Sequence, residues 1–197
     1  TSSTTAAASS NAVSPDAKST DQTLGGGIAV GSSDGEAVKG GTLVVSMPSS
    51  PRTLDPKAYS TMYENHIMYN VLDTLFVWDK DCKEVIPSLA TDYTVSDDGL
   101  TYTINLRDDV YFQKGKFQDG RKMTADDVVY SLERSKEEST TDRICRDFFD
   151  YCEAASPTQV VIHMKSVAGP FISQLAGIGN AILPKEEVEG WGEDFGS

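Results

Sequence analysis

Three pairs of adjacent aspartates are the residues of this sequence that could most readily do acid–base or metal chemistry: Asp97-Asp98, Asp108-Asp109 and Asp126-Asp127. Two carboxylates can act as general acid and base on a glycosidic bond, but only at a three-dimensional separation that a sequence does not show. Each pair also has a local explanation, as a turn, a strand end or a helix start. No calcium loop of the form D-x-[DN]-x-[DN]-G is present. We therefore predict structural roles for the pairs.

The sequence also lacks the motifs of other common metal, phosphate-binding and esterase sites. His66 and His163 have no histidine or cysteine companion at the spacing of zinc ligands. The run Gly25-Gly26-Gly27 is not followed by the Lys-Ser/Thr of a phosphate loop, and no G-x-S-x-G motif supplies an esterase nucleophile. We expect no metal, no cofactor and no enzymatic activity.

The chain has three cysteines, Cys82, Cys145 and Cys152. Cys145 and Cys152 are close enough in sequence to form a small local disulfide if their Cβ atoms face each other, and an extracellular location would permit it. The alternative is three reduced cysteines, one on a turn and two near a helix–strand junction. Three reactive thiols in the unreduced, unfolded chain would exclude the bridge.

Length and charge exclude several classes of partner. The 197 residues suffice for one domain with a buried core, and 30 Asp+Glu against 17 Lys+Arg give a formal charge of -13. Such an acidic chain lacks the clustered Lys/Arg needed to bind nucleic acid or anionic lipid without sequence specificity. No stretch approaches the roughly 20 apolar residues of a membrane-spanning helix. Because the chain starts at Thr1 without an apolar leader, we expect a mature or trimmed product.

The first 38 residues are predicted to be a flexible tether. Of residues 1–35, 24 are Ser, Thr, Ala or Gly and none is aromatic. Such a segment buries too little apolar surface to offset its ordering entropy. It is typical of a linker that holds a surface protein away from a membrane or wall. The alternatives are a cloning remnant or an exposed tail.

From residue 39 onward, short apolar elements alternate with turn signals and predict a mixed α/β architecture. Tyr102, Ile104 and Leu106 alternate with polar residues after the turn Ser96–Gly99, which predicts a hairpin with one buried and one wet face. The other predicted elements are strands at 42–46, 76–78 and 160–164, and helices at 62–73, after Thr124, after Pro170 and after Pro184.

Seven segments follow one another in an order that resembles the family 5 extracellular solute-binding proteins, the peptide-, nickel- and oligosaccharide-binding lipoproteins of ABC importers. The resemblance covers residues 39–197 collinearly. The segments are Gly40–Val45, Thr53–Pro56, Val85–Ala90, Ser96–Arg107, Met123–Arg134, Ala181–Lys185 and Trp191–Gly196.

The resemblance implies an α/β, periplasmic-binding-protein-like class II fold with an extra small domain, of which this chain would hold the N-terminal part as a mixed sheet with helices. The implied divisions are the tether (1–38), the first strand and loop of the main ligand-binding lobe (39–56), the small insert domain (57–180) and the return towards the main lobe (181–197). A lipid-modified cysteine would precede the tether and hold the protein at the outer face of the cell membrane, or the protein would be periplasmic.

The implied function is capture of a small ligand, most simply a short peptide, and its delivery to an ABC permease by closure of two lobes. The alternatives are a metal chelate or an oligosaccharide as ligand, or a surface or sensory lipoprotein that uses the same fold without transport. We expect that this portion, without the second lobe, does not bind the natural ligand with useful affinity.

In that family, the loop after the first strand and the start of the next helix reach the ligand. The corresponding residues are Ser49, Ser50, Pro51, Tyr59, Met62 and Tyr63. The resemblance implies that oligopeptide binders of this family carry a glutamate at the position of Ser50, where it helps to hold the peptide's amino group. Ser50 cannot supply that negative charge. Tyr59 and Tyr63 offer flat apolar faces with polar tips for stacking, with ordinary packing at a helix entrance as the alternative.

Overall fold

The computed structural model describes residues 22–24, 28–30, 40–138 and 147–197. The chain divides into two units, residues 1–45 and residues 46–197. In the first unit, β1 (Gln22–Leu24) and β2 (Ile28–Val30) form an antiparallel pair inside the segment predicted as a tether. The rest of residues 1–38 lies outside the described residues.

The strand predicted at 42–46 is not formed. Residues 42–46 have no regular secondary structure, and Leu43 and Val44 are each 87% exposed. An apolar, β-prone run becomes a strand only when a neighbouring strand supplies hydrogen bonds and covers one face. Among the residues that the structure describes, no strand pairs with this run.

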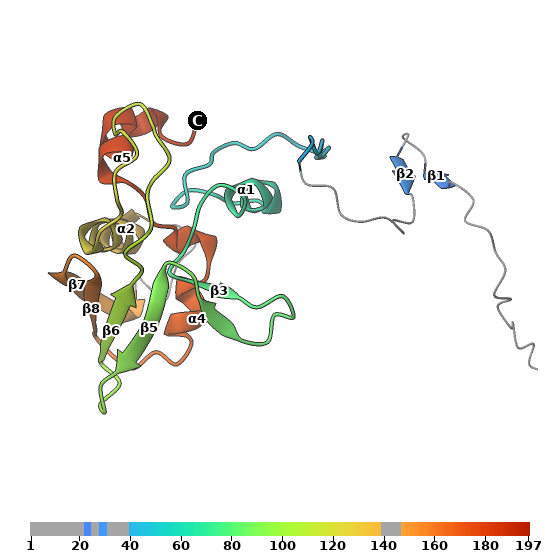
Figure 1. Ribbon diagram of the computed structural model, residues 1–197. Helices are drawn as coiled ribbons and strands as arrows, with labels where there is room; N and C mark the ends of the chain where they lie inside the picture. Colours follow the sequence, from blue (N-terminus) through green and yellow to red (C-terminus); the bar gives the residue numbers. More distant parts are fainter. Residues whose placement is uncertain (1–21, 25–27, 31–39, 139–146) are drawn as a thin grey trace, which may run out of the picture. The chain divides into compact units, whose positions relative to one another are not determined.

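The second unit is built on a four-stranded antiparallel sheet of strand order β5-β6-β8-β7 (Figure 1). Its strands are β5 (Ala90–Val95), β6 (Thr101–Leu106), β7 (Phe149–Ser156) and β8 (Gln159–Met164). The predicted hairpin is confirmed as β5 and β6, and every second residue of β6 and β8 is buried. Because β5 is the sheet's edge, Tyr93 and Val95 stay 42% and 43% exposed.

One face of the sheet packs against helices. In α2 (Ala125–Glu138), Val128 and Leu132 are buried in the same core as Ile104 of β6. From α4 (Phe171–Leu175), the ring of Phe171 lies 5.1 Å from that of Tyr102. Both helices begin where the sequence predicted. Asp126 and Asp127 lie in the first turn of α2, where the helix dipole favours acids.

The first helix of the second unit is shorter than predicted. Helix α1 covers Met62–Met68 rather than 62–73, and Val71 is half exposed. The side-chain amide of Asn70 donates to the backbone oxygen of His66 at 2.6 Å. It therefore takes the place of the backbone N–H that would bind this oxygen if the helix continued. A separate hairpin follows, formed by β3 (Phe76–Trp78) and β4 (Val85–Pro87), in agreement with the predicted short strand at 76–78.

The C-terminal segment returns beside α1 and α2. A 3-10 turn (Ile178–Asn180) leads to α5 (Lys185–Trp191), which starts after Pro184 as predicted, and to a second 3-10 turn (Gly192–Asp194). Met68 of α1 is buried against Ile178 and Ala181, a small cluster that Tyr59 also contacts. None of the helices in the described part of the chain is long and apolar enough to cross a membrane.

Candidate functional site

The segment predicted to reach a ligand is organised around the carboxylate of Glu64, which is fully buried. Its Oε1 accepts a hydrogen bond from the backbone N–H of Arg52 at 3.1 Å. Its Oε2 accepts from the backbone N–H groups of Ser60 and Thr61 at 2.7 and 2.9 Å. Thr61 Oγ1 accepts from the N–H of Glu64, which completes a capping box at the start of α1. One side chain therefore joins the loop around Arg52 to the entrance of the helix.

These bonds stabilise the ionised form of Glu64. The N–H of Ser60 lowers the pKa of Glu64 most, and the N–H groups of Thr61 and Arg52 lower it further, whereas burial raises it. The net result is a pKa lowered from 4.5 to about 2.

A Glu64→Gln variant is expected to be less stable than the wild type near neutral pH, with a difference that shrinks in acid. A carboxylate whose folded-state pKa is depressed stabilises the fold above its unfolded-state pKa, and that stability is lost as the pH falls from about 4.5 towards 2. Thermal unfolding midpoints of both proteins between pH 7 and pH 3 would measure this. A constant difference across the range would show that the charge of Glu64 does not matter.

The six predicted ligand residues lie in two short groups that Glu64 brings together. Ser49 and Ser50 are exposed and Pro51 is partly buried in the first group, and Met62, at the first position of α1, is 70% exposed in the second. Tyr63 is partly buried. Tyr59 packs against the cluster of Met68, Ile178 and Ala181. A packing role for Tyr59 is therefore present, and its contact with a ligand stays a prediction.

The motif Thr53–Pro56 is fixed by Asp55, whose buried carboxylate accepts two hydrogen bonds from Arg134 of α2, at 2.8 and 2.7 Å. The N–H of Leu54 donates to the backbone oxygen of Gly196 at 2.6 Å. A Cβ on Gly196 would lie 2.4 Å from the backbone N of Asp55, so only glycine allows this approach. The sequence offered no signal for this anchor, because 79 residues separate Asp55 from Arg134.

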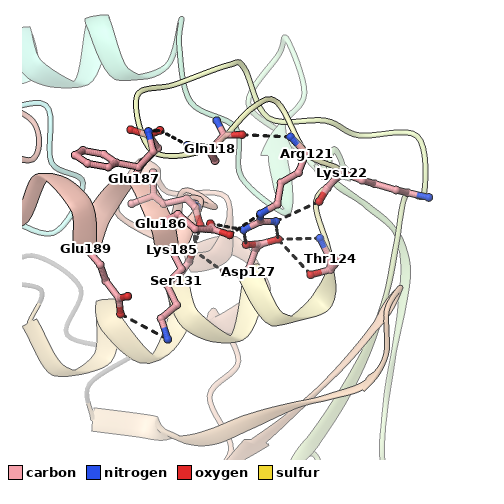
Figure 2. A network of polar contacts seen from close by, with 12 residues as sticks. Gln118, Arg121, Lys122, Thr124, Asp127, Ser131, Lys185, Glu186, Glu187 and Glu189 are labelled. Atoms are coloured by element: carbon pink, nitrogen blue, oxygen red, sulfur yellow. Dashed lines mark hydrogen bonds and ion pairs between the residues drawn. The ribbon is translucent and has the colours of Figure 1, made fainter.

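A cavity of about 340 Å³ lies elsewhere in the second unit, between the turn after α1, the loop before α2 and the start of α5. Val110, Phe112 and Ile182 give it an apolar lining, and Glu187 lies at its wall. Glu187 fastens the loop to α5, because its Oε1 accepts from the N–H groups of Phe117 and Gln118 at 2.6 and 3.0 Å (Figure 2). None of the six predicted ligand residues lines this cavity.

The aspartate pairs are engaged locally. Arg121 lies between Asp127 and Glu186 (Figure 2). Its guanidinium nitrogens lie 2.5 to 2.8 Å from the carboxylate oxygens of these two residues. The contact with Arg121 lowers the pKa of Glu186. Asp98 accepts hydrogen bonds from Ser96 and Leu100 in the hairpin turn, and Asp109 accepts two from Arg107. One member of each pair therefore has the structural role that we predicted.

The histidines and cysteines form no joint site in the part of the chain that the structure describes. The ring of His163 is stacked on Tyr151 at 4.4 Å, and His66 is exposed. Cys82 is free and exposed, while Cys152 is free and buried, and burial raises the pKa of its thiol. Cys145 lies outside the described residues. The Cys145–Cys152 bridge therefore stays a prediction.

Comparisons with known proteins agree on one family. A model described as bacterial extracellular solute-binding proteins, family 5 middle, matches residues 84–196. The glutathione-binding protein GsiB of Salmonella typhimurium is 36% identical over 159 residues, which cover 78% of this chain and 29% of GsiB. GsiB of Escherichia coli K12 is 32% identical over 156 residues. This chain thus spans about 29% of the length of the curated relatives it matches.

Solved structures show the same fold, that of class II periplasmic binding proteins. The periplasmic binding protein DppA from Helicobacter pylori, in complex with the peptide STSA, matches with a TM-score of 0.64 and 24% identity, covering 72% of this chain and 30% of DppA. The binding protein MoaA of A. tumefaciens R10, in complex with mannopinic acid, matches with a TM-score of 0.66 and 25% identity, covering 73% and 29%. The predicted fold class is therefore confirmed.

Proposed function

We propose, since the chain belongs to family 5 of the bacterial extracellular solute-binding proteins, that the protein it forms captures short peptides outside the cytoplasm and delivers them to the permease of an ABC importer. The observation that carries the proposal is the family match over residues 84–196. The names of the relatives favour a peptide, because GsiB is called glutathione-binding and glutathione is itself a tripeptide.

The proposed contact surface consists of the loop at Ser49–Pro51, whose two serines are exposed, and the entrance of α1 at Tyr59, Met62 and Tyr63. Its support is the way Glu64 ties these two segments together, which presents them as one preorganised surface. Exposed Met62 offers an adaptable apolar side chain and the tyrosines offer flat faces. The surface holds no acid–base pair, so its proposed role is binding rather than catalysis.

We place this surface where the main lobe meets the small insert domain, in a two-lobed binder that closes on its ligand. Closure requires ligand contacts that are stronger in the closed than in the open state. In this proposal, residues 57–180 form the small insert domain, residues 39–56 and 181–197 belong to the main lobe, and residues 1–38 are a tether that follows a lipid anchor at the cell surface.

A second candidate ligand has its own support. The match to MoaA, whose structure contains mannopinic acid, favours a small organic acid derived from a sugar. Like a peptide, such a ligand carries a carboxylate and several hydrogen-bonding groups. A sensory role without transport would use the same binding surface but would not need a permease.

Calorimetry on the intact protein tests the ligand class. Di- and tripeptides, glutathione, mannopinic acid, a nickel chelate and a neutral oligosaccharide are titrated separately. We expect saturable one-to-one binding of peptides and none of the nickel chelate or the oligosaccharide. Tight binding of mannopinic acid without peptide binding would replace the first candidate by the second.

The transport role is tested with the cognate permease in proteoliposomes. The peptide-loaded protein should stimulate ATP hydrolysis by the importer, because the closed form is the one the permease recognises in this proposal. Peptide binding without any stimulation would favour the sensory role.

A further inference from the structure

Most arginines in the described part of the chain bind a carboxylate in a bidentate (two-pronged) pair, in which two N–H groups donate to the same carboxylate. Two N–H groups of Arg107 donate to Asp109 at 2.9 and 3.0 Å. Arg121 does the same with Asp127, and Arg134 with Asp55. This parallel geometry is the one in which a guanidinium recognises carboxylates best.

Arg52 differs from these three. Its side chain is 74% exposed, and its Nη2 donates to Ser60 Oγ at 2.7 Å, its one side-chain hydrogen bond within the described residues. The nearest carboxylate is that of Glu64, whose Oε1 lies 4.0 Å from the Arg52 Nε. Both Glu64 oxygens already accept backbone N–H groups. Arg52 is thus a positioned guanidinium without a two-pronged carboxylate partner.

The position of Arg52 links it to the proposed ligand surface. It directly follows Pro51, and its hydrogen bond reaches Ser60, which follows Tyr59 and lies two residues before Met62. The guanidinium therefore lies between the two groups of residues proposed to contact ligand. Because the hydrogen bond to Ser60 already orders the Arg52 side chain, ligand binding would cost less side-chain entropy.

We propose that Arg52 is a specificity-determining residue that receives a carboxylate of the ligand. The proposal rests on the peptide-capture function above and narrows its ligand class to molecules with a free carboxylate. The net charge of the chain does not attract anions, since 30 acidic residues stand against 17 basic ones and interactions between exposed charges are screened beyond about 8 Å. A ligand carboxylate would therefore be held by direct contact with a cation such as Arg52.

The test uses the intact protein and two probes, trialanine and trialanine amide, which differ only in the carboxylate. The wild type should bind trialanine at least about 10-fold more tightly than the amide. Arg52→Gln should weaken trialanine binding by about 10–100-fold while changing amide binding by less than about 3-fold. Arg52→Lys keeps the positive charge but not the planar guanidinium, so its affinity for trialanine should lie between those of the wild type and Arg52→Gln.

Three further arms make the result specific. Arg107→Gln removes an exposed arginine that already holds Asp109 and should leave both affinities unchanged. Ala-Glu-Ala amide carries its carboxylate on a side chain, and an Arg52 effect on this probe but not on trialanine would assign the contact to an acidic side chain. Because Arg52 is exposed, Arg52→Gln should unfold at the wild-type temperature, which separates lost contact from lost fold.

The outcomes separate this proposal from the function on which it rests. If the wild type binds both probes and Arg52→Gln changes neither affinity, Arg52 does not receive the carboxylate and peptide capture stands. If Arg52→Gln lowers the unfolding temperature and weakens both probes equally, the partner of Arg52 is a carboxylate of the protein itself, and the proposal is overturned. If the wild type binds none of the peptides, peptide capture fails and the Arg52 proposal fails with it.

Discussion

Replacing Arg134 by methionine is expected to lower the free energy of unfolding by about 3–5 kcal/mol, because it leaves the buried carboxylate of Asp55 without its partner. The two side chains are only 10% and 7% exposed, and two hydrogen bonds of 2.8 and 2.7 Å join them. The arginine also lies over the ring of Phe195 at 5.6 Å. Urea unfolding of both proteins, followed by circular dichroism, measures the difference.

A matched control is Arg107→Met. Arg107 and Asp109 make the same two-pronged pair, but their side chains are 47% and 66% exposed, so the expected loss is below about 1 kcal/mol. In the double variant Asp55→Leu/Arg134→Met, an apolar pair replaces the buried ions and should recover much of the lost stability. A loss for Arg134→Met no larger than that for Arg107→Met would show that the anchor at Thr53–Pro56 does not stabilise the fold.

Truncating Phe171 to alanine should cost a similar amount, about 3–5 kcal/mol, through lost apolar contact and the cavity left behind. The ring is fully buried in the main core, and its contact with Tyr102 joins α4 to β6. Denaturant unfolding again measures the effect.

Tyr111→Ala provides the surface control, since Tyr111 is mostly exposed, and a change of about 0.5 kcal/mol or less is expected there. If Phe171→Ala were equally mild, α4 would not be part of the cooperative core.

The elements that the sequence predicted well are those with local causes. The β5–β6 hairpin has a turn in which Gly99 adopts a φ of +72° and a strand with strict alternation, and α2 has acids in its first turn. β7 was missed because its buried residues, Phe149 and Cys152, do not follow a period of two, and the register shifts between Phe149 and Tyr151. The strand predicted at 42–46 failed for the opposite reason, since its local pattern was good and a partner strand was lacking among the described residues.

The candidate site was predicted only in part. The order of the motifs led to the family and to the loop at Ser49–Pro51, but not to the groups that hold this loop. The spacing of Thr61 and Glu64 is that of a capping box, so the helix start was visible in the sequence. That the same glutamate also binds the N–H of Arg52, and that Arg134 reaches Asp55, depends on the path of the chain in space.

The most direct test of peptide capture is to identify what the intact protein carries when it is purified from its own cells. The protein is denatured, and the released small molecules are analysed by mass spectrometry, with the Arg52→Gln variant prepared in parallel. We predict that the wild type releases short peptides with a free carboxylate and that the variant releases far less of them. Release of a nickel chelate or a neutral oligosaccharide in stoichiometric amounts, with no peptide, would contradict the proposed function.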